Sequence, residues 1–197
     1  MSAFTNNRKS LVLKDPSFIT KLFNNPLAGL IWLPIRVWIG WQWLEAALHK
    51  FESPAWMQTG AALKGFWAGA VAVSATGTTP IHYVWYREFL QFLLNVQAYT
   101  WFAKLVPVGE FLVGVTMILG IFTGFSALVG GFMNFNFMMA GSASVNPMFF
   151  ALCVLLVAGW KVSGYFGADF FLFPLINSLR SRRIERAPIR SPKGAEA

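Results

Sequence analysis

The sequence predicts an all-α integral membrane protein: a four-helix bundle with an additional amphipathic, interfacial helical segment between spans one and two. Of the 197 residues, 56% are hydrophobic and 12% are charged, whereas soluble domains carry roughly 25% charged residues. Long apolar runs recur along the chain, and basic residues collect at its two ends. A net charge of +8 concentrated in this way favours contact with anionic membrane lipid and argues against a nucleic-acid partner.

Four apolar segments are long enough, or nearly long enough, to cross a hydrocarbon core, which takes about 20 helical residues. The expected spans are residues 29–48, 101–121, 125–140 and 147–162. The last two are short, so we expect them to extend by a turn at either end or to run nearly upright.

The segment between the first two spans, residues 51–100, is expected to form a helical cap on the outer side. Residues 54–73 and 82–99 are both predicted to be helical, with a break before Pro80. In the second helix the polar side chains gather on one side, which is typical of an amphipathic helix at a membrane surface. The segment is also rich in the aromatic residues of membrane interfaces: Trp56, Trp67, Tyr83, Trp85, Tyr86, Tyr99 and Trp101.

The basic residues predict the orientation in the cell membrane. Those before the first span are Arg8, Lys9, Lys14 and Lys21, and those after the fourth are Arg180, Arg182, Arg183, Arg186, Arg190 and Lys193. By the positive-inside rule both termini face the cytoplasm, which requires an even number of spans. The chain is thereby divided into a cytoplasmic segment 1–26, a membrane domain 27–175 and a basic cytoplasmic tail 176–197.

Charged side chains inside a membrane cost several kcal/mol each, so each needs a partner or a function. Arg36 and Glu110 fall in the first and second expected spans, roughly 10 Å and 16 Å from their cytoplasmic ends at 1.5 Å per residue. Gly114, one turn after Glu110, would let the two helices approach closely. We predict an Arg36–Glu110 ion pair that acts either as a strut or directly in proton or ligand handling.

A second polar group is expected near the outer side of the first span. Glu45 and His49 lie one turn apart there and could line a pocket with polar residues of span three. A carboxylate, an imidazole and aromatic walls suit a quinone head group, which needs hydrogen-bond partners, a proton path and flat apolar surfaces. The alternative is a polar cluster that satisfies its own hydrogen bonds. The candidate catalytic residues are Glu45, His49 and Glu110, and the candidate cofactor-binding residues are Gln42, Trp41, Trp43, Asn134 and Asn136.

Metal and haem sites are not expected. The chain has two histidines, His49 and His82, and one cysteine, Cys153. A bis-histidine haem needs two histidines facing each other, and one cysteine cannot form an internal disulfide or a thiolate cluster. Cys153 is expected to be a small apolar residue of a buried helix.

Several residues of the chain occur in a recognisable order. The first span carries Arg36, Gly40, Ala47 and Lys50, the second carries Glu110, Gly114, Leu119, Gly120 and Thr123, and the fourth is followed by Gly164 and Asp169. Over roughly residues 34–174 this set resembles the DoxX family of small four-helix membrane proteins. The family includes DoxD, the membrane subunit of thiosulfate:quinone oxidoreductase. Two positions depart from the pattern: Ala47 replaces a usual glycine, and Gly124 stands where an arginine often follows the threonine.

The resemblance implies a membrane subunit of a quinone-linked oxidoreductase system that passes electrons from a sulfur compound such as thiosulfate to quinone. The chain has no electron carrier of its own, so a protein partner would carry that redox chemistry. The alternative is a non-catalytic membrane anchor or scaffold that docks a redox enzyme. Transport is a third option, although the spans show no clear internal repeat. Homo-oligomer formation is open.

Overall fold

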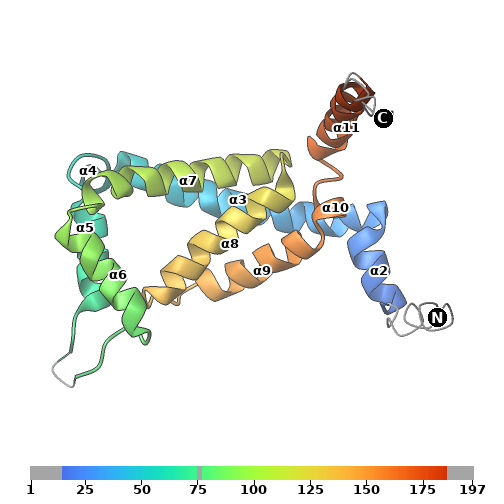
Figure 1. Ribbon diagram of the computed structural model, residues 1–197. Helices are drawn as coiled ribbons and strands as arrows, with labels where there is room; N and C mark the ends of the chain where they lie inside the picture. The colour runs from blue at the N-terminus through green and yellow to red at the C-terminus, as the bar shows by residue number, and fades with distance from the viewer. Residues whose placement is uncertain (1–14, 75–76, 186–197) are drawn as a thin grey trace, which may run out of the picture.

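The computed structural model describes residues 15–74 and 77–185, and every regular element in these ranges is helical. The all-α prediction is therefore confirmed for this part of the chain. Each of the four expected spans has a matching helix, and these helices pack along one another (Figure 1). They are α3 (Gly29–Glu52), α7 (Tyr99–Leu119), α8 (Thr123–Met139) and α9 (Asn146–Ala158).

Among the described helices, α7 is the one that is both long and apolar enough to cross a membrane by length and composition. Helix α3 has 24 residues but carries charged side chains, and α8 and α9 have 17 and 13 residues. Length thus separates α7 from α8 and α9, and composition separates it from α3.

Helices α3 and α7 form the closest pair of the bundle, and α8 packs mainly on α9. The contact between α3 and α7 is made by glycines. A Cβ atom at Gly40 would lie 2.9 Å from the Gly114 carbonyl oxygen, and one at Gly114 would lie 2.8 Å from the Leu44 nitrogen. Since only glycine fits at both positions, the two backbones touch, as the sequence predicted for Gly114.

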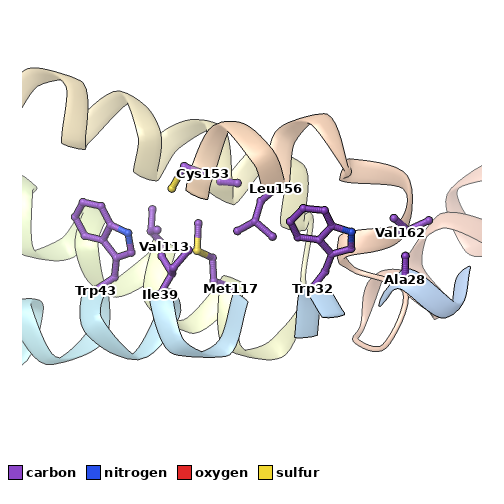
Figure 2. Close-up of a cluster of buried hydrophobic side chains, with 10 residues drawn as sticks. Ala28, Trp32, Ile39, Trp43, Val113, Met117, Cys153, Leu156 and Val162 are labelled. Carbon is purple, nitrogen blue, oxygen red and sulfur yellow. The ribbon is translucent and has the colours of Figure 1, made fainter. Parts of the chain in front are cut away.

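Apolar side chains from these helices meet in one core. Figure 2 shows the labelled side chains in a row along the bundle, with Trp43 at one end and Ala28 at the other. Cys153 belongs to this cluster and is buried and free, in keeping with its expected apolar role. The core side chains are Ala28, Trp32, Ile39, Trp43, Val113, Met117, Ala127, Cys153, Leu156 and Val162.

Three shorter helices lie at the end of the bundle where α3 ends and α7 begins (Figure 1). They are α4 (Pro54–Met57), α5 (Ala61–Val71) and α6 (Val84–Asn95). They pack around their own buried residues, which include Leu63, Trp67, Tyr86 and Leu90.

Two of the expected boundaries differ in this region. The predicted helix 54–73 is broken at Gly60, whose φ is +70° and whose Cβ would meet the Tyr99 carbonyl oxygen at 2.6 Å. The predicted helix 82–99 ends at Asn95, because Gln97 adopts a left-handed φ of 54° before α7 begins. Gly60 thus packs against the start of α7, and Gln97 lies in the turn that carries the chain back into the bundle.

The opposite end of the bundle holds α2 (Ser17–Asn24), the short 3-10 helix η2 (Pro26–Ala28), α10 (Trp160–Ser163) and α11 (Asp169–Glu185). The predicted fourth span, 147–162, is interrupted at Gly159 between α9 and α10. Helix α11 projects away from the bundle (Figure 1). The predicted basic residues 8, 9 and 14, and the predicted tail after residue 185, lie outside the described residues.

Candidate functional site

The face of α3 that packs on α7 carries a charged residue near each end. Arg36, Gly40, Trp43, Ala47 and Lys50 follow one another at intervals of four, three, four and three residues, which places them on one side of the helix. The first four are buried. Arg36 and Lys50 are about 21 Å apart along the axis at 1.5 Å per residue, so they lie in separate surroundings.

Lys50 forms an ion pair with Glu110. Its Nζ atom donates to both carboxylate oxygens of Glu110 at 2.8 Å. The Glu110 side chain is 2% exposed and the Lys50 side chain 20%. The ammonium group also lies 5.3 Å from the centre of the Trp56 ring, within the range of a cation–π contact. The predicted Arg36–Glu110 ion pair is therefore wrong.

The antiparallel register of α3 and α7 explains this correction. Gly40 faces Gly114, and the chain directions are opposite. Glu110 precedes Gly114, so it faces the part of α3 after Gly40, where Lys50 lies. Arg36 precedes Gly40, so it faces the end of α7. The prediction from the sequence placed Arg36 and Glu110 by their distances from the expected helix ends. Those distances do not determine the register between α3 and α7.

A cavity of about 380 Å³ lies beside the Lys50–Glu110 pair. It is bounded by α3, α5 and α8, by the start of α9 and by the connection before it. Its walls are mostly apolar with a few polar groups, as is usual for small-molecule sites. The lining residues are Gln42, Trp43, Ala46, Lys50, Trp56, Leu63, Phe66, Glu110, Asn134, Phe137, Ser142, Val145, Asn146 and Phe149.

Asn134, which lines this cavity, has two buried polar atoms, Oδ1 and Nδ2, without a hydrogen-bond partner in the described part of the chain. Nε1 of Trp43 is also unpaired there, but it faces the core beside Gly130 and Val113 and not the cavity (Figure 2). Asn134 is 1% exposed. Leaving a buried donor or acceptor unpaired costs about 1–3 kcal/mol, so folding alone does not favour this arrangement. The Asn134 amide is thus a buried polar group at the cavity wall that the described residues leave without a partner.

The structure brings together four of the residues predicted from the sequence, Gln42, Trp43, Glu110 and Asn134, around this cavity. It does not bring Trp41, Glu45 or His49 there, since all three are exposed on the outer side of α3.

Helix geometry accounts for that separation. At about 100° per residue, Glu45 is roughly 160° away from Trp43 around the helix. Gln42 lies between the Trp43 side and the Glu45 side of α3. It lines the cavity and is three residues before Glu45, so the sequence alone suggested that Glu45 and His49 line the cavity too. The predicted grouping of Glu45 and His49 with Asn134 in one pocket is therefore wrong.

Asn136 lies outside the cavity as well, because it is two residues from Asn134 and points to another side of α8. Its Nδ2 donates to the Phe132 carbonyl at 2.8 Å, and its Oδ1 accepts from the Tyr86 hydroxyl at 3.2 Å. Burial raises the pKa of Tyr86, which keeps the hydroxyl protonated as a donor. Asn136 thus joins α8 to α6 and has no free polar atom for a ligand.

Arg36, at the other end of the α3 face, is closely surrounded by backbone. We call its surroundings the filled region. Its Nη2 donates to the Phe166 carbonyl at 3.1 Å. A Cβ atom at Gly120 or Gly167 would clash with its guanidinium group, so the backbone is packed directly against it. Nε and Nη1 have no hydrogen-bond partner within residues 15–74 and 77–185, but the backbone packed against the guanidinium group occupies the space beside them.

Asp169 is the second buried charge of that region. Its two carboxylate oxygens accept the backbone N–H groups of Phe122 at 2.6 Å and Thr123 at 2.9 Å. These are the first amides of α8, so Asp169 caps the helix from 46 residues away in sequence.

Sequence reasoning missed Lys50 as a site residue, although its spacing from Arg36 could have identified it. The repeat of four and three residues from Arg36 through Gly40, Trp43 and Ala47 continues to Lys50 and places it on the α7 side. Trp56 gave no comparable signal, because its position depends on the turn between α3 and α5.

Comparison of the chain with models of protein families, with curated proteins and with solved structures found no match. In residues 15–74 and 77–185, no group of three or more His, Cys, Asp or Glu side chains is placed to hold a metal ion. The cavity beside Lys50 and Glu110 is therefore the basis for assigning a function.

Proposed function

We propose that this chain is a DoxX-like multi-pass membrane protein that binds a quinone head group in the Lys50–Glu110 cavity. In this proposal it is the membrane subunit of a quinone-linked oxidoreductase system. The observation that carries the proposal is the cavity itself, where the Lys50–Glu110 ion pair and the unpaired amide of Asn134 lie in one mostly apolar wall.

The surface of the bundle supports a membrane location. Large apolar side chains are exposed on all four long helices, whereas water-soluble proteins seldom expose extended apolar surface. Arg36 and Lys50 point inward to α7, as polar groups do in a membrane bundle. Helices α2 and α11 share one end (Figure 1), which fits cytoplasmic termini. The exposed residues include Leu30, Ile31, Trp38, Leu105, Leu112, Leu119, Phe125, Leu128, Phe132, Met148, Val154 and Leu155.

The positions that carry the family resemblance support the DoxX assignment, because they converge on three contacts. Gly40 meets Gly114, and Lys50 pairs with Glu110. Five of the other seven gather at the filled region: Arg36, Gly120, Thr123, Gly164 and Asp169. Residues far apart in the sequence thus meet in the structure.

The donors of the cavity suit the two carbonyl oxygens of a quinone. The amide N–H of Asn134 and the ammonium of Lys50 can each donate a hydrogen bond. Phe66, Phe137 and other aromatic side chains supply apolar walls for the ring.

Reduction of a quinone to the quinol takes up two electrons and two protons. In the proposal the electrons come from a redox centre of a partner protein, which oxidises its own substrate, for example a sulfur compound. The role of this chain is to hold the quinone ring and to supply protons. Lys50 and Glu110 lie at the cavity wall, where an ammonium and a carboxylate can relay protons to a bound carbonyl.

One observation favours the second candidate, a non-catalytic anchor for a soluble redox enzyme. Helix α11 projects from the bundle, and its Phe171 is 73% exposed. Leu175 and Leu179 on the same helix are also exposed. Such a helix offers apolar surface to a partner without any need for the cavity.

Calorimetric titration of the purified protein in lipid nanodiscs with a tail-free dimethoxy-methyl-benzoquinone tests the proposal. Asn134→Ala removes the unpaired amide at the cavity wall, so we expect about tenfold weaker binding, or about 1.4 kcal/mol. Asn136→Ala is the matched control, because Asn136 lies on another side of α8 and does not line the cavity. Absence of quinone binding by the wild-type protein would overturn the proposal in favour of the anchor.

A further inference from the structure

An apolar groove of about 330 Å³ lies between the α5–α6 cap and helices α7 and α8. Its polar side chains, those of Tyr86 and Asn136, are hydrogen-bonded to each other. The other lining residues are Leu63, Phe66, Trp67, Phe89, Leu90, Leu93, Phe102, Leu105, Val106, Gly109, Phe132, Met133, Phe137 and Ala140.

The groove and the Lys50–Glu110 cavity share part of their walls. Leu63, Phe66 and Phe137 line both spaces. The rings of Phe66 and Phe137 meet edge to face, with centroids 6.5 Å apart. Side chains rather than backbone therefore separate the polar cavity from the apolar groove, and side-chain rotations are fast compared with backbone rearrangement.

The outer end of the groove reaches the surface of the bundle. Phe132 is 66% exposed, and Leu105 and Phe89 are about half exposed. In a membrane this surface faces lipid. The two spaces together thus form a path that is apolar at the lipid side and polar at its inner end, which matches a molecule with a polar head and a long hydrocarbon tail.

We propose that the groove holds the isoprenoid tail of a quinone whose head group occupies the cavity, with Phe66 and Phe137 at the junction of head and tail. This inference rests on the proposed function and names the part of the ligand that the groove recognises. Membrane lipid is as apolar as the groove, so the tail gains affinity from van der Waals packing against the groove walls and not from transfer out of water.

Gly109 offers a way to fill the groove. It lies on α7, and an added Cβ would meet Met133 at 3.6 Å, which is ordinary van der Waals contact. A larger side chain there extends into the groove. Gly69 on α5 is the matched control, because it is exposed in a helix and a Cβ there meets nothing within 4 Å.

The experiment compares two quinones by calorimetry in nanodiscs: the tail-free dimethoxy-methyl-benzoquinone and its decyl-chain analogue. We expect the wild-type protein to bind the decyl analogue at least about tenfold tighter. Gly109→Leu should lower that ratio at least about fivefold while leaving the affinity for the tail-free quinone unchanged. Gly69→Leu should change neither. Partition of the decyl chain into lipid is the same for all variants and cancels in the comparison.

A second pair of variants tests the mouth of the groove independently of the fold around Gly109. Leu105→Trp places a bulky ring at the mouth, and Leu112→Trp adds the same ring two turns along the exposed face of α7. Only Leu105→Trp should lower the ratio of the affinity for the decyl analogue to the affinity for the tail-free quinone.

The outcomes separate the two proposals. Binding of the tail-free quinone with the same ratio in Gly109→Leu, Leu105→Trp and wild type would overturn the groove inference and leave the quinone function standing. Binding of neither quinone by the wild type would overturn both.

Discussion

Two buried charged regions lie along the same pair of helices, α3 and α7, and they are packed in opposite ways. Around Arg36 the backbone at Gly120 and Gly167 presses on the guanidinium group, and Asp169 caps α8. Around Lys50 the chain leaves a cavity of about 380 Å³.

The difference shows that a buried charge does not by itself mark a binding site. Arg36 and Asp169 connect α3, α8 and the chain after α10, and their region has no room for another molecule. The Lys50–Glu110 pair has an equally buried carboxylate, but the cavity beside it is also lined by Asn134, which has two polar atoms without partners among the described residues. The packing of the first region therefore serves stability, and the second is the region that we propose to bind a ligand.

The largest expected effect is on stability and comes from breaking the Lys50–Glu110 pair. Lys50→Met leaves the Glu110 carboxylate buried without its partner, and removal of one member of a buried pair costs about 3–5 kcal/mol. Thermal unfolding in detergent, followed by circular dichroism, should show a clearly lower Tm. The double variant Lys50→Met/Glu110→Leu should recover most of the loss, since neither charge is left. A Lys50→Met protein as stable as wild type would contradict the observed ion pair.

The next effect separates the filled region from the cavity. Asp169→Ala removes the acceptor of two backbone N–H groups at the start of α8, which should lower the unfolding free energy by about 2 kcal/mol. Quinone affinity of the folded protein should stay unchanged, because the cavity is at the other end of α3. Asp169→Asn, which keeps one acceptor oxygen, should lie between the two. Weaker quinone binding without lost stability would show that the two regions are not separate.

The smallest expected effect concerns the outer side of α3. Glu45→Gln/His49→Ala alters two exposed side chains that do not line the cavity. Calorimetry should give the wild-type affinity for the tail-free quinone within about twofold. A large loss of binding would restore the site predicted from the sequence and count against the cavity.

The all-helical fold and the positions of the four long helices followed from apolar runs and turn residues, because both are local properties of the chain. The register between helices did not follow, since it depends on contacts such as Gly40 with Gly114. That missing register is why Glu110 was matched with Arg36 and not with Lys50.

The candidate site was predicted in part for the same reason. Gln42, Trp43 and Asn134 were predicted as cofactor-binding residues and do line the cavity, and Glu110, predicted as the partner of Arg36, lines it as well. Each is a polar or aromatic group inside an apolar helix, which a sequence shows directly. Glu45 and His49 share those properties, but their direction depends on which side of α3 packs against α7. The spacing of four and three residues from Arg36 to Lys50 indicates which side of α3 packs against α7, provided that it is followed over the whole helix.

The most direct test of the central claim, that the cavity is a ligand site and not a structural cluster, is the variant Asn134→Leu. Leucine is close to asparagine in shape, and the substitution removes two unpaired buried polar atoms. We therefore expect a protein at least as stable as wild type. We also expect at least about tenfold weaker binding of the tail-free quinone, because a hydrogen-bond partner is lost. Thermal unfolding and calorimetry of the same preparation give both values. A clear loss of stability with unchanged quinone affinity would contradict the claim.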